Sequence, residues 1–119
     1  MMKQDAGNTV SISFEDLSAL LNRIFLKHGA NEEVAAILSD NCASCERDGC
    51  HSHGIFRMPG YVRNLETGWA DGKAEPSAEE VGPSFLRIDA RNGFAQPAFE
   101  LYRKRIADMV AATGVAVVA

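Results

Sequence analysis

Hydrophobic residues recur at helical spacing in two neighbouring stretches near the start of the chain. The first stretch predicts a helix over residues 14–28, with Ser13 as the start of a weak capping box and Gly29 as its stop. The second predicts a helix from about Asn31 to just before Asp48, with acidic residues in the first turn, where the helix dipole favours anions. A short connection makes these helices an αα-hairpin.

The following segment mixes residues that favour and residues that break a helix. Ser52 can cap a helix in which His53 and Arg57 are four residues apart and therefore share one face. Pro59 removes one backbone hydrogen bond from such a helix and bends its axis. The pattern predicts a kinked helix that ends near Thr67.

The last third of the chain predicts the beginning of a sheet. Glycine and proline recur over residues 69–83, which predicts a loop, and residues 84–90 alternate as a strand does. A helix then ends at Gly114, and the apolar residues 115–119 predict a strand covered on both faces in a parallel sheet. This is a βαβ unit. Because sheets usually have about four to six strands, the chain is expected to be the N-terminal part of a longer protein or to need a partner.

These elements together predict an α/β fold whose sheet domain is incomplete and is not of the Rossmann type. We expect a flexible tail over residues 1–10, an N-terminal helical region over residues 11–68, and the start of an α/β domain over residues 69–119. The helical region consists of the αα-hairpin and the kinked helix. The glycines near the third helix do not form a G-x-G-x-x-G sequence after a strand, so these residues carry no Rossmann fingerprint.

Amino-acid composition and net charge exclude several classes of protein. Hydrophobic residues make up 46% and charged residues 24% of the 119 residues, which excludes a disordered or collagen-like chain. The formal net charge of −4 argues against a nucleic-acid partner. Since no apolar run approaches the roughly 18 residues that span a bilayer, and no signal-peptide pattern begins the chain, we expect a cytoplasmic protein with no membrane partner.

The candidate chemistry lies between Cys42 and Tyr61. A histidine has an unperturbed pKa of about 6.5, so the His53 imidazole is a natural proton donor or acceptor. Arg57 offers a planar fork to a carboxylate, and Ser52 can hydrogen-bond the imidazole and set its tautomer. This pattern suits a small acid that gains or loses a proton next to its carboxylate.

Two other interpretations of the segment stay open. The first is a zinc site built on Cys42, Cys45, Cys50 and the neighbouring His51, which are correct ligand types for that metal. The second is purely structural, because Cys42 and Cys45 lie on the apolar stripe of a predicted helix, where free cysteine behaves as a small hydrophobe. The catalytic interpretation needs no metal.

The segment as a whole resembles a known family. Arg47-Asp48-Gly49, followed by the run from His51 to Tyr61, is similar to the type 2 malate/L-lactate dehydrogenase family, and within it to the Δ1-piperideine-2-carboxylate/Δ1-pyrroline-2-carboxylate reductases. The similarity continues through Gly68-Trp69 and Gly93-Phe94-Ala95-Gln96-Pro97 and covers nearly all of the chain after residue 10.

The resemblance implies an NAD(P)H-dependent oxidoreductase that reduces cyclic imino acids, with NADPH as the expected cofactor and NADH as the alternative. It implies that Ser52 and His53 are catalytic and that Arg57 and Tyr61 bind the substrate. It also implies a homodimer, and cofactor-binding residues that lie mostly beyond Ala119. This chain alone is therefore expected to be inactive. A dehydrogenase of 2-hydroxy acids, which acts on 2-oxo acids in reverse, is the alternative within the family.

Overall fold

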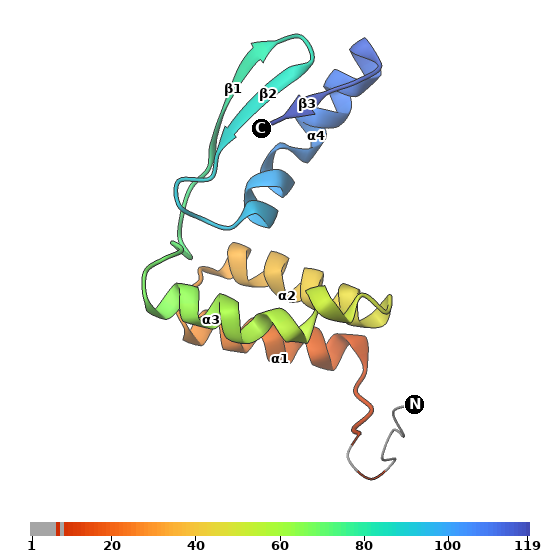
Figure 1. The fold of residues 1–119 in the computed structure, drawn as a ribbon, viewed down its shortest axis with the longest axis vertical. Helices are drawn as coiled ribbons and strands as arrows, with labels where there is room; N and C mark the ends of the chain where they lie inside the picture. The colour runs from red at the N-terminus through yellow and green to blue at the C-terminus, as the bar shows by residue number, and fades with distance from the viewer. Residues whose placement is uncertain (1–6, 8) are drawn as a thin grey trace.

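A computed structural model describes residues 7 and 9–119 and shows a helical part below a small sheet part (Figure 1). The helical part comprises α1 (Phe14–Lys27), α2 (Glu32–Arg47), the 3-10 turns η1 (His51–His53) and η2 (Ile55–Arg57), and α3 (Met58–Glu66). The sheet part comprises β1 (Ser77–Gly82), β2 (Phe85–Asp89), α4 (Ala95–Thr113) and β3 (Val117–Val118). The predicted tail over residues 1–10 lies mostly outside the described residues, and the other two domain boundaries stay predictions.

The αα-hairpin is confirmed, and local capping explains its bounds. The Ser13 hydroxyl oxygen accepts a hydrogen bond from the backbone N–H of Asp16 at 3.1 Å, and Asn31 Oδ1 accepts one from the N–H of Val34 at 2.9 Å. Both contacts satisfy backbone donors that a helix start leaves unpaired. Between the two helices Gly29 has a φ of +107°, which a residue without a Cβ adopts at no steric cost.

The core lies within the helical part. Side chains from α1 and α2 form most of it, and Met58 of α3 and Phe94, just before α4, complete it. Its remaining buried members are Leu17, Leu21, Phe25, Ala30, Val34, Ala35, Leu38, Cys42 and Ala43. Because Phe94 belongs to this core, the start of α4 is anchored to the helical part rather than to the sheet alone.

Replacing Phe25 with alanine is expected to lower the free energy of unfolding by about 3–5 kcal/mol, since the ring is fully buried and would leave a cavity. Urea denaturation followed by circular dichroism measures this difference. Leu26→Ala is the matched control, because the Leu26 side chain is 41% exposed and should lose less than about 1 kcal/mol. Equal losses in the two variants would contradict the placement of the core.

The βαβ unit is also confirmed. β2 and β3 are parallel neighbours joined through α4, and Phe85 pairs with Val117 and Leu86 with Val118. The predicted loop over residues 69–83 is wrong in part, because residues 77–82 form β1, which pairs antiparallel with β2 in the order β1-β2-β3. β1 carries Glu79 and Glu80 and has no hydrophobic alternation. β1 forms because it is hydrogen-bonded to β2, and the pattern of residues along the chain does not reveal this pairing.

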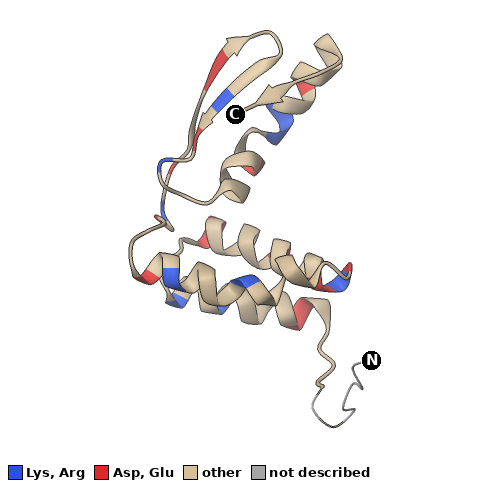
Figure 2. Cartoon of the chain, in the orientation of Figure 1, with Lys and Arg blue, Asp and Glu red and all other residues tan. Residues whose placement is uncertain are grey.

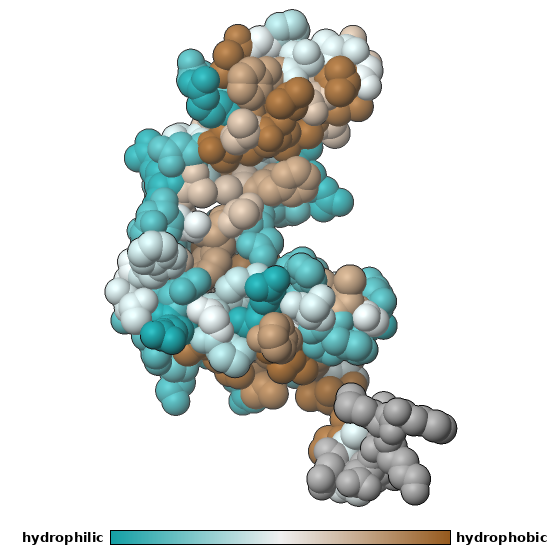
Figure 3. All heavy atoms as spheres, viewed as in Figure 1, coloured by the Kyte–Doolittle hydropathy of each residue, from teal (hydrophilic) through white to brown (hydrophobic). Residues whose placement is uncertain are grey.

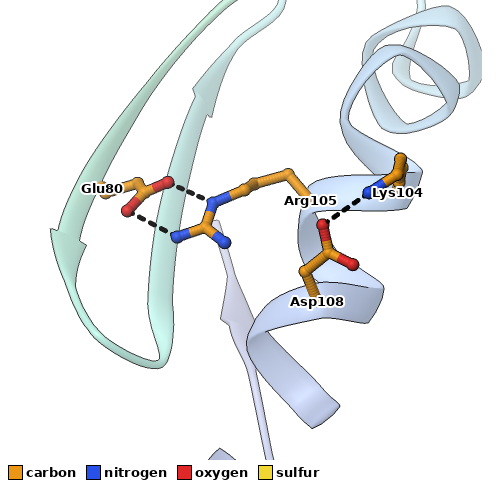
Figure 4. Close-up of polar contacts among 4 residues, drawn as sticks. All are labelled: Glu80, Lys104, Arg105 and Asp108. Atoms are coloured by element: carbon orange, nitrogen blue, oxygen red, sulfur yellow. Dashed lines mark hydrogen bonds and ion pairs between the residues drawn. The ribbon is translucent and has the colours of Figure 1, made fainter. Parts of the chain in front are cut away.

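Side chains hold β1 against α4 (Figure 4). The Arg105 guanidinium contacts both carboxylate oxygens of Glu80, with Nη2 2.8 Å from Oε2, and its hydrogen bonds hold the pKa of that carboxyl below its ordinary value. Within α4, Lys104 Nζ donates to Asp108 at 2.8 Å. Water screens these exposed pairs, so each contributes little to the free energy of unfolding. Acidic and basic residues occur in both parts of the molecule (Figure 2).

The sheet part exposes a hydrophobic face. Val117 and Val118 of β3 are 56% and 39% exposed, so the expectation of a strand covered on both sides is not met within this chain. β3 is the terminal strand of the sheet, and α4 adds further exposed hydrophobic side chains. Figure 3 shows hydrophobic residues gathered over this part. Across the described residues, no helix combines the length and the hydropathy needed to cross a bilayer.

The predicted kinked helix is wrong. Two 3-10 turns precede α3, and Gly54 separates them with φ −93° and ψ −128°, which are not helical angles. Pro59 lies in the first turn of α3, where backbone N–H groups have no hydrogen-bond partner within the helix. The lack of an N–H in proline therefore costs nothing there, and Pro59 begins a helix rather than bending one. His53 and Arg57 therefore belong to successive short turns and do not share the face of one α-helix.

Candidate active site

The predicted catalytic residues lie on the two turns that connect the end of α2 to the start of α3 (Figure 1). Ser52, His53 and Arg57 are all exposed, whereas Gly54 between the turns is buried. Consecutive 3-10 turns tighten the chain, because each closes a hydrogen bond over three residues. The segment thus presents several polar side chains to solvent from a short, closely wound stretch of backbone.

Ser52 and His53 are in direct contact. The Ser52 hydroxyl oxygen lies 2.8 Å from His53 Nδ1, which is a hydrogen bond between neighbouring side chains. This contact uses one ring nitrogen and leaves Nε2 as the nitrogen that can face a ligand. Where the hydroxyl donates to Nδ1, the ring proton resides on Nε2, and the imidazole can give that proton to a bound molecule. The hydrogen bond expected from the sequence is present.

Arg57 ends the second turn and occupies the N-cap position of α3. Among the described residues, no carboxylate forms an ion pair with it, although seven other basic side chains do have such a partner: His28, Arg47, His51, Arg87, Arg103, Lys104 and Arg105. Its donors face solvent one turn beyond His53. A guanidinium in this state can form two parallel hydrogen bonds to a carboxylate.

Tyr61 lies elsewhere, in the contact between the two parts of the molecule. Its ring packs against Phe25 at a centroid distance of 6.1 Å and edge-on against Phe94 at 5.4 Å. Its hydroxyl oxygen accepts a hydrogen bond from Gln96 Nε2 at 3.1 Å. These contacts hold α3, and hence Arg57 at its start, against the beginning of α4. A role in substrate binding stays a prediction for this residue.

Tyr61→Phe is expected to lower the free energy of unfolding by about 0.5–1.5 kcal/mol, because it removes one partly buried hydrogen bond and keeps the ring packing. Chemical denaturation of Tyr61→Phe, Gln96→Ala and the double variant measures the coupling between the two side chains. Strictly additive losses would show that the hydroxyl and the amide do not interact.

Glu46 is a residue of this segment that sequence reasoning missed. Its Oε2 lies 2.7 Å from His51 Nδ1, and its Oε1 accepts the backbone N–H of Ile55 at 2.7 Å. The hydrogen bond with His51, followed by the one from Ile55, lowers the pKa of the Glu46 carboxyl. A lowered pKa means that this stabilisation is present above the ordinary value of 4.5 and is lost as pH falls through the lower folded-state value.

One signal in the sequence points to Glu46. It lies in the last turn of α2, where the helix dipole disfavours an anion and no backbone N–H of the helix itself is free to compensate. The pattern of hydrophobic positions does not show the contacts of Glu46, because His51 and Ile55 lie beyond the end of α2.

The cysteines do not assemble a metal site within the described part of the chain. No group of three or more potential metal ligands occurs there. Cys42 lies in the hydrophobic core, and burial raises the pKa of its thiol to about 11, which disfavours the thiolate that zinc binds. Cys45 is partly buried and Cys50 is exposed. This arrangement favours the structural interpretation of Cys42.

Two hollows lie near these elements. An open one of about 390 Å³ adjoins the site and is lined by Glu46, His51, Ser52 and Phe56. A larger one of about 610 Å³ lies between α2 and α4 and contains none of the predicted site residues. The smaller hollow is the more relevant, because Ser52 and the exposed residue Phe56 line it. The imidazole in its lining is that of His51, and neither His53 nor Arg57 lines it.

Comparison with known proteins agrees with the motif. A Δ1-pyrroline-2-carboxylate/Δ1-piperideine-2-carboxylate reductase from Pseudomonas syringae pv. tomato is 53% identical over 111 residues. One from Pseudomonas putida is 45% identical over 119 residues. These matches cover 93% and 100% of this chain but 32% and 35% of the two relatives. The chain thus spans about a third of the length of the curated relatives it matches.

Solved structures share the fold. The Δ1-piperideine-2-carboxylate reductase from Pseudomonas syringae superposes with a TM-score of 0.88, over 93% of this chain and 33% of that one. The malate dehydrogenase from Pyrococcus horikoshii is 27% identical and superposes with a TM-score of 0.81, over 92% of this chain and 31% of that one. The family model of the malate/L-lactate dehydrogenases matches residues 12–119. The chain therefore belongs to the malate/L-lactate dehydrogenase family.

Proposed function

We propose that this chain contributes the proton donor and the carboxylate-binding residue to an NADPH-dependent reductase of cyclic imino acids. Its expected substrates are Δ1-piperideine-2-carboxylate and Δ1-pyrroline-2-carboxylate, which relatives of up to 53% identity are named for. The observation that carries the proposal is the hydrogen-bonded Ser52–His53 pair, which lies one turn from an Arg57 without an ion-pair partner among the described residues.

The proposed roles follow from the chemistry of each group. Arg57 binds the carboxylate of the substrate and orients the adjacent C=N bond, which is catalysis by positioning. Ser52 holds Nδ1 of His53, so that Nε2 carries a proton to the ring nitrogen of the substrate. Tyr61 supports the helix that begins at Arg57, and its predicted contact with substrate is part of the proposal.

No described residue is assigned to the nicotinamide cofactor. The described turns between strands and helices lack the G-x-G-x-x-G phosphate loop, and the stretch that leads into α4 reads Arg91-Asn92-Gly93-Phe94. A bound nicotinamide would supply the hydride that reduces the C=N carbon. The proposal for this chain is limited to substrate binding and proton transfer. It includes a homodimer, which the resemblance implies, and action in the cytoplasm, which is the expectation from the sequence pattern.

A comparison of turnover tests the proposal. The native polypeptide that carries this sequence should oxidise NADPH when Δ1-piperideine-2-carboxylate or Δ1-pyrroline-2-carboxylate is added, and more slowly with oxaloacetate or pyruvate. The same assay with NADH ranks the two cofactors. Activity with the 2-oxo acids and none with the imines would replace the proposal by its alternative.

That alternative is a dehydrogenase of 2-hydroxy acids. The fold shared with the Pyrococcus horikoshii malate dehydrogenase favours it, and the same residues would serve it. Arg57 would bind the carboxylate of a 2-oxo acid, and His53 would protonate the carbonyl oxygen instead of a ring nitrogen. The higher identity with the imino-acid reductases makes imine reduction the first choice.

A further inference from the structure

We infer that Glu46 is a positioning residue for His53, and that Gly54 is required because only a residue without a side chain leaves room for the Glu46 carboxylate. This inference rests on the proposed function, since it concerns the residue proposed as proton donor. Glu46 itself contacts the backbone and His51 rather than the imidazole of His53. It acts through the shape of the turn.

The contacts of Glu46 enclose the catalytic pair. Oε2 binds the side chain of His51, the residue before Ser52, and Oε1 binds the backbone of Ile55, the second residue after His53. One carboxylate thus joins both ends of the stretch from His51 to Ile55 to the end of α2. The Glu46 side chain is 21% exposed, but that of His51 is 72% exposed, so water reaches the hydrogen bond between them.

Gly54 provides the space for this contact. A Cβ at Gly54 would overlap Glu46 Oε1 and would lie 2.7 Å from both Cδ and Cγ of the same side chain. The atoms in the way belong to a flexible side chain, so the carboxylate would swing aside rather than the backbone of the turn. Both hydrogen bonds of Glu46 would then be lost. Gly54→Ala should therefore reproduce the effect of removing the Glu46 carboxylate.

His53 depends on Glu46 more than Arg57 does. Arg57 precedes Met58, whose buried side chain anchors the start of α3 in the core. His53 has no such neighbour, since Ser52 and His53 are both exposed and the hydrogen bonds of the turn are local. Loss of Glu46 should accordingly impair proton transfer more than carboxylate binding. In kinetic terms, kcat should fall and KM should change little.

The test compares Glu46→Ala, Gly54→Ala and the double variant in the native polypeptide. Amide hydrogen exchange at Ile55 should accelerate by about tenfold or more in each single variant, because its acceptor is gone. The two ring-nitrogen resonances of His53 should move toward those of a free imidazole. kcat should fall by up to roughly 100-fold, and the double variant should match the single variants, since both remove the same contact.

Two further variants separate position from charge and from general damage. Glu46→Gln keeps an oxygen that accepts the Ile55 N–H, and it should restore protection at Ile55 and most of kcat. Glu33→Gln changes an exposed glutamate at the other end of α2, and it should alter neither the exchange rate at Ile55 nor kcat. Glu46→Gln also guards against a misfolded alanine variant, because it preserves the volume of the side chain.

Several outcomes would overturn the inference. Unchanged exchange at Ile55 in Glu46→Ala, or additive effects of Glu46→Ala and Gly54→Ala, would show that the carboxylate does not hold the turn. A fall in kcat with unchanged His53 resonances would point to an effect other than positioning. Absence of imine reduction in the wild-type protein would instead overturn the proposed function, and the exchange measurements would still decide whether Glu46 holds this segment.

Discussion

Replacing His53 with alanine is expected to lower kcat for imine reduction by roughly 10²- to 10⁴-fold, the usual contribution of a positioned proton donor. KM should change little, because the substrate carboxylate is assigned to Arg57. Steady-state kinetics of the native polypeptide across the pH range measures both constants.

The control for this prediction is another histidine. His28 caps the end of α1 and lies 2.8 Å from Glu66, outside the proposed site, so His28→Gln should keep the wild-type turnover. Ser52→Ala should give an intermediate loss, because the imidazole stays but its Nδ1 partner is gone. Wild-type turnover in His53→Ala would refute the assignment of the proton donor.

Replacing Arg57 with alanine is expected to raise KM by about 10- to 100-fold, which corresponds to the loss of hydrogen bonds between charged groups. We expect a smaller fall in kcat, because binding of the carboxylate also orients the C=N bond. Arg57→Lys should recover only part of the affinity, because an ammonium lacks the planar fork of a guanidinium. Substrate-saturation curves for the three proteins measure these differences.

A second arginine of the same region serves as the control. Arg63 lies on α3 and is exposed, and among the described residues its side chain forms no hydrogen bond or ion pair with the segment that carries Ser52 and His53. Arg63→Ala should leave KM unchanged. If Arg57→Ala also left KM unchanged, the carboxylate would have to bind elsewhere. In that case the absence of an ion-pair partner at Arg57 would have no bearing on the substrate.

The hairpin could be predicted from the sequence because its determinants are local. Hydrophobic residues at helical spacing, the caps at Ser13 and Asn31, and the positive φ of Gly29 all act within a few residues of one another. The same holds for the parallel pair of strands around α4, whose alternation and apolar run are readable along the chain. The motif from His51 to Tyr61 identified the family for the same reason: its information is contiguous.

The errors arose where a distant partner determines the structure. β1 forms because β2 offers its edge, and not because residues 77–82 have a strand pattern of their own. The segment before α3 is wound into two short turns instead of one helix, with the Glu46 carboxylate bound to His51 and Ile55. Helical spacing alone placed His53 and Arg57 on one face, because it takes no account of that contact.

The sequence by itself determined the helices of the hairpin, the βαβ unit, the family and the residue types of the candidate site. Tertiary structure alone decided that Tyr61 packs between Phe25 and Phe94, that Cys42 is buried in the core, and that Glu46 holds the turn beside His53. The physical reason is the separation along the chain of the residues that interact. Caps and periodicity depend on neighbours within one or two turns, whereas these contacts exist only after α2, α3 and α4 have packed together.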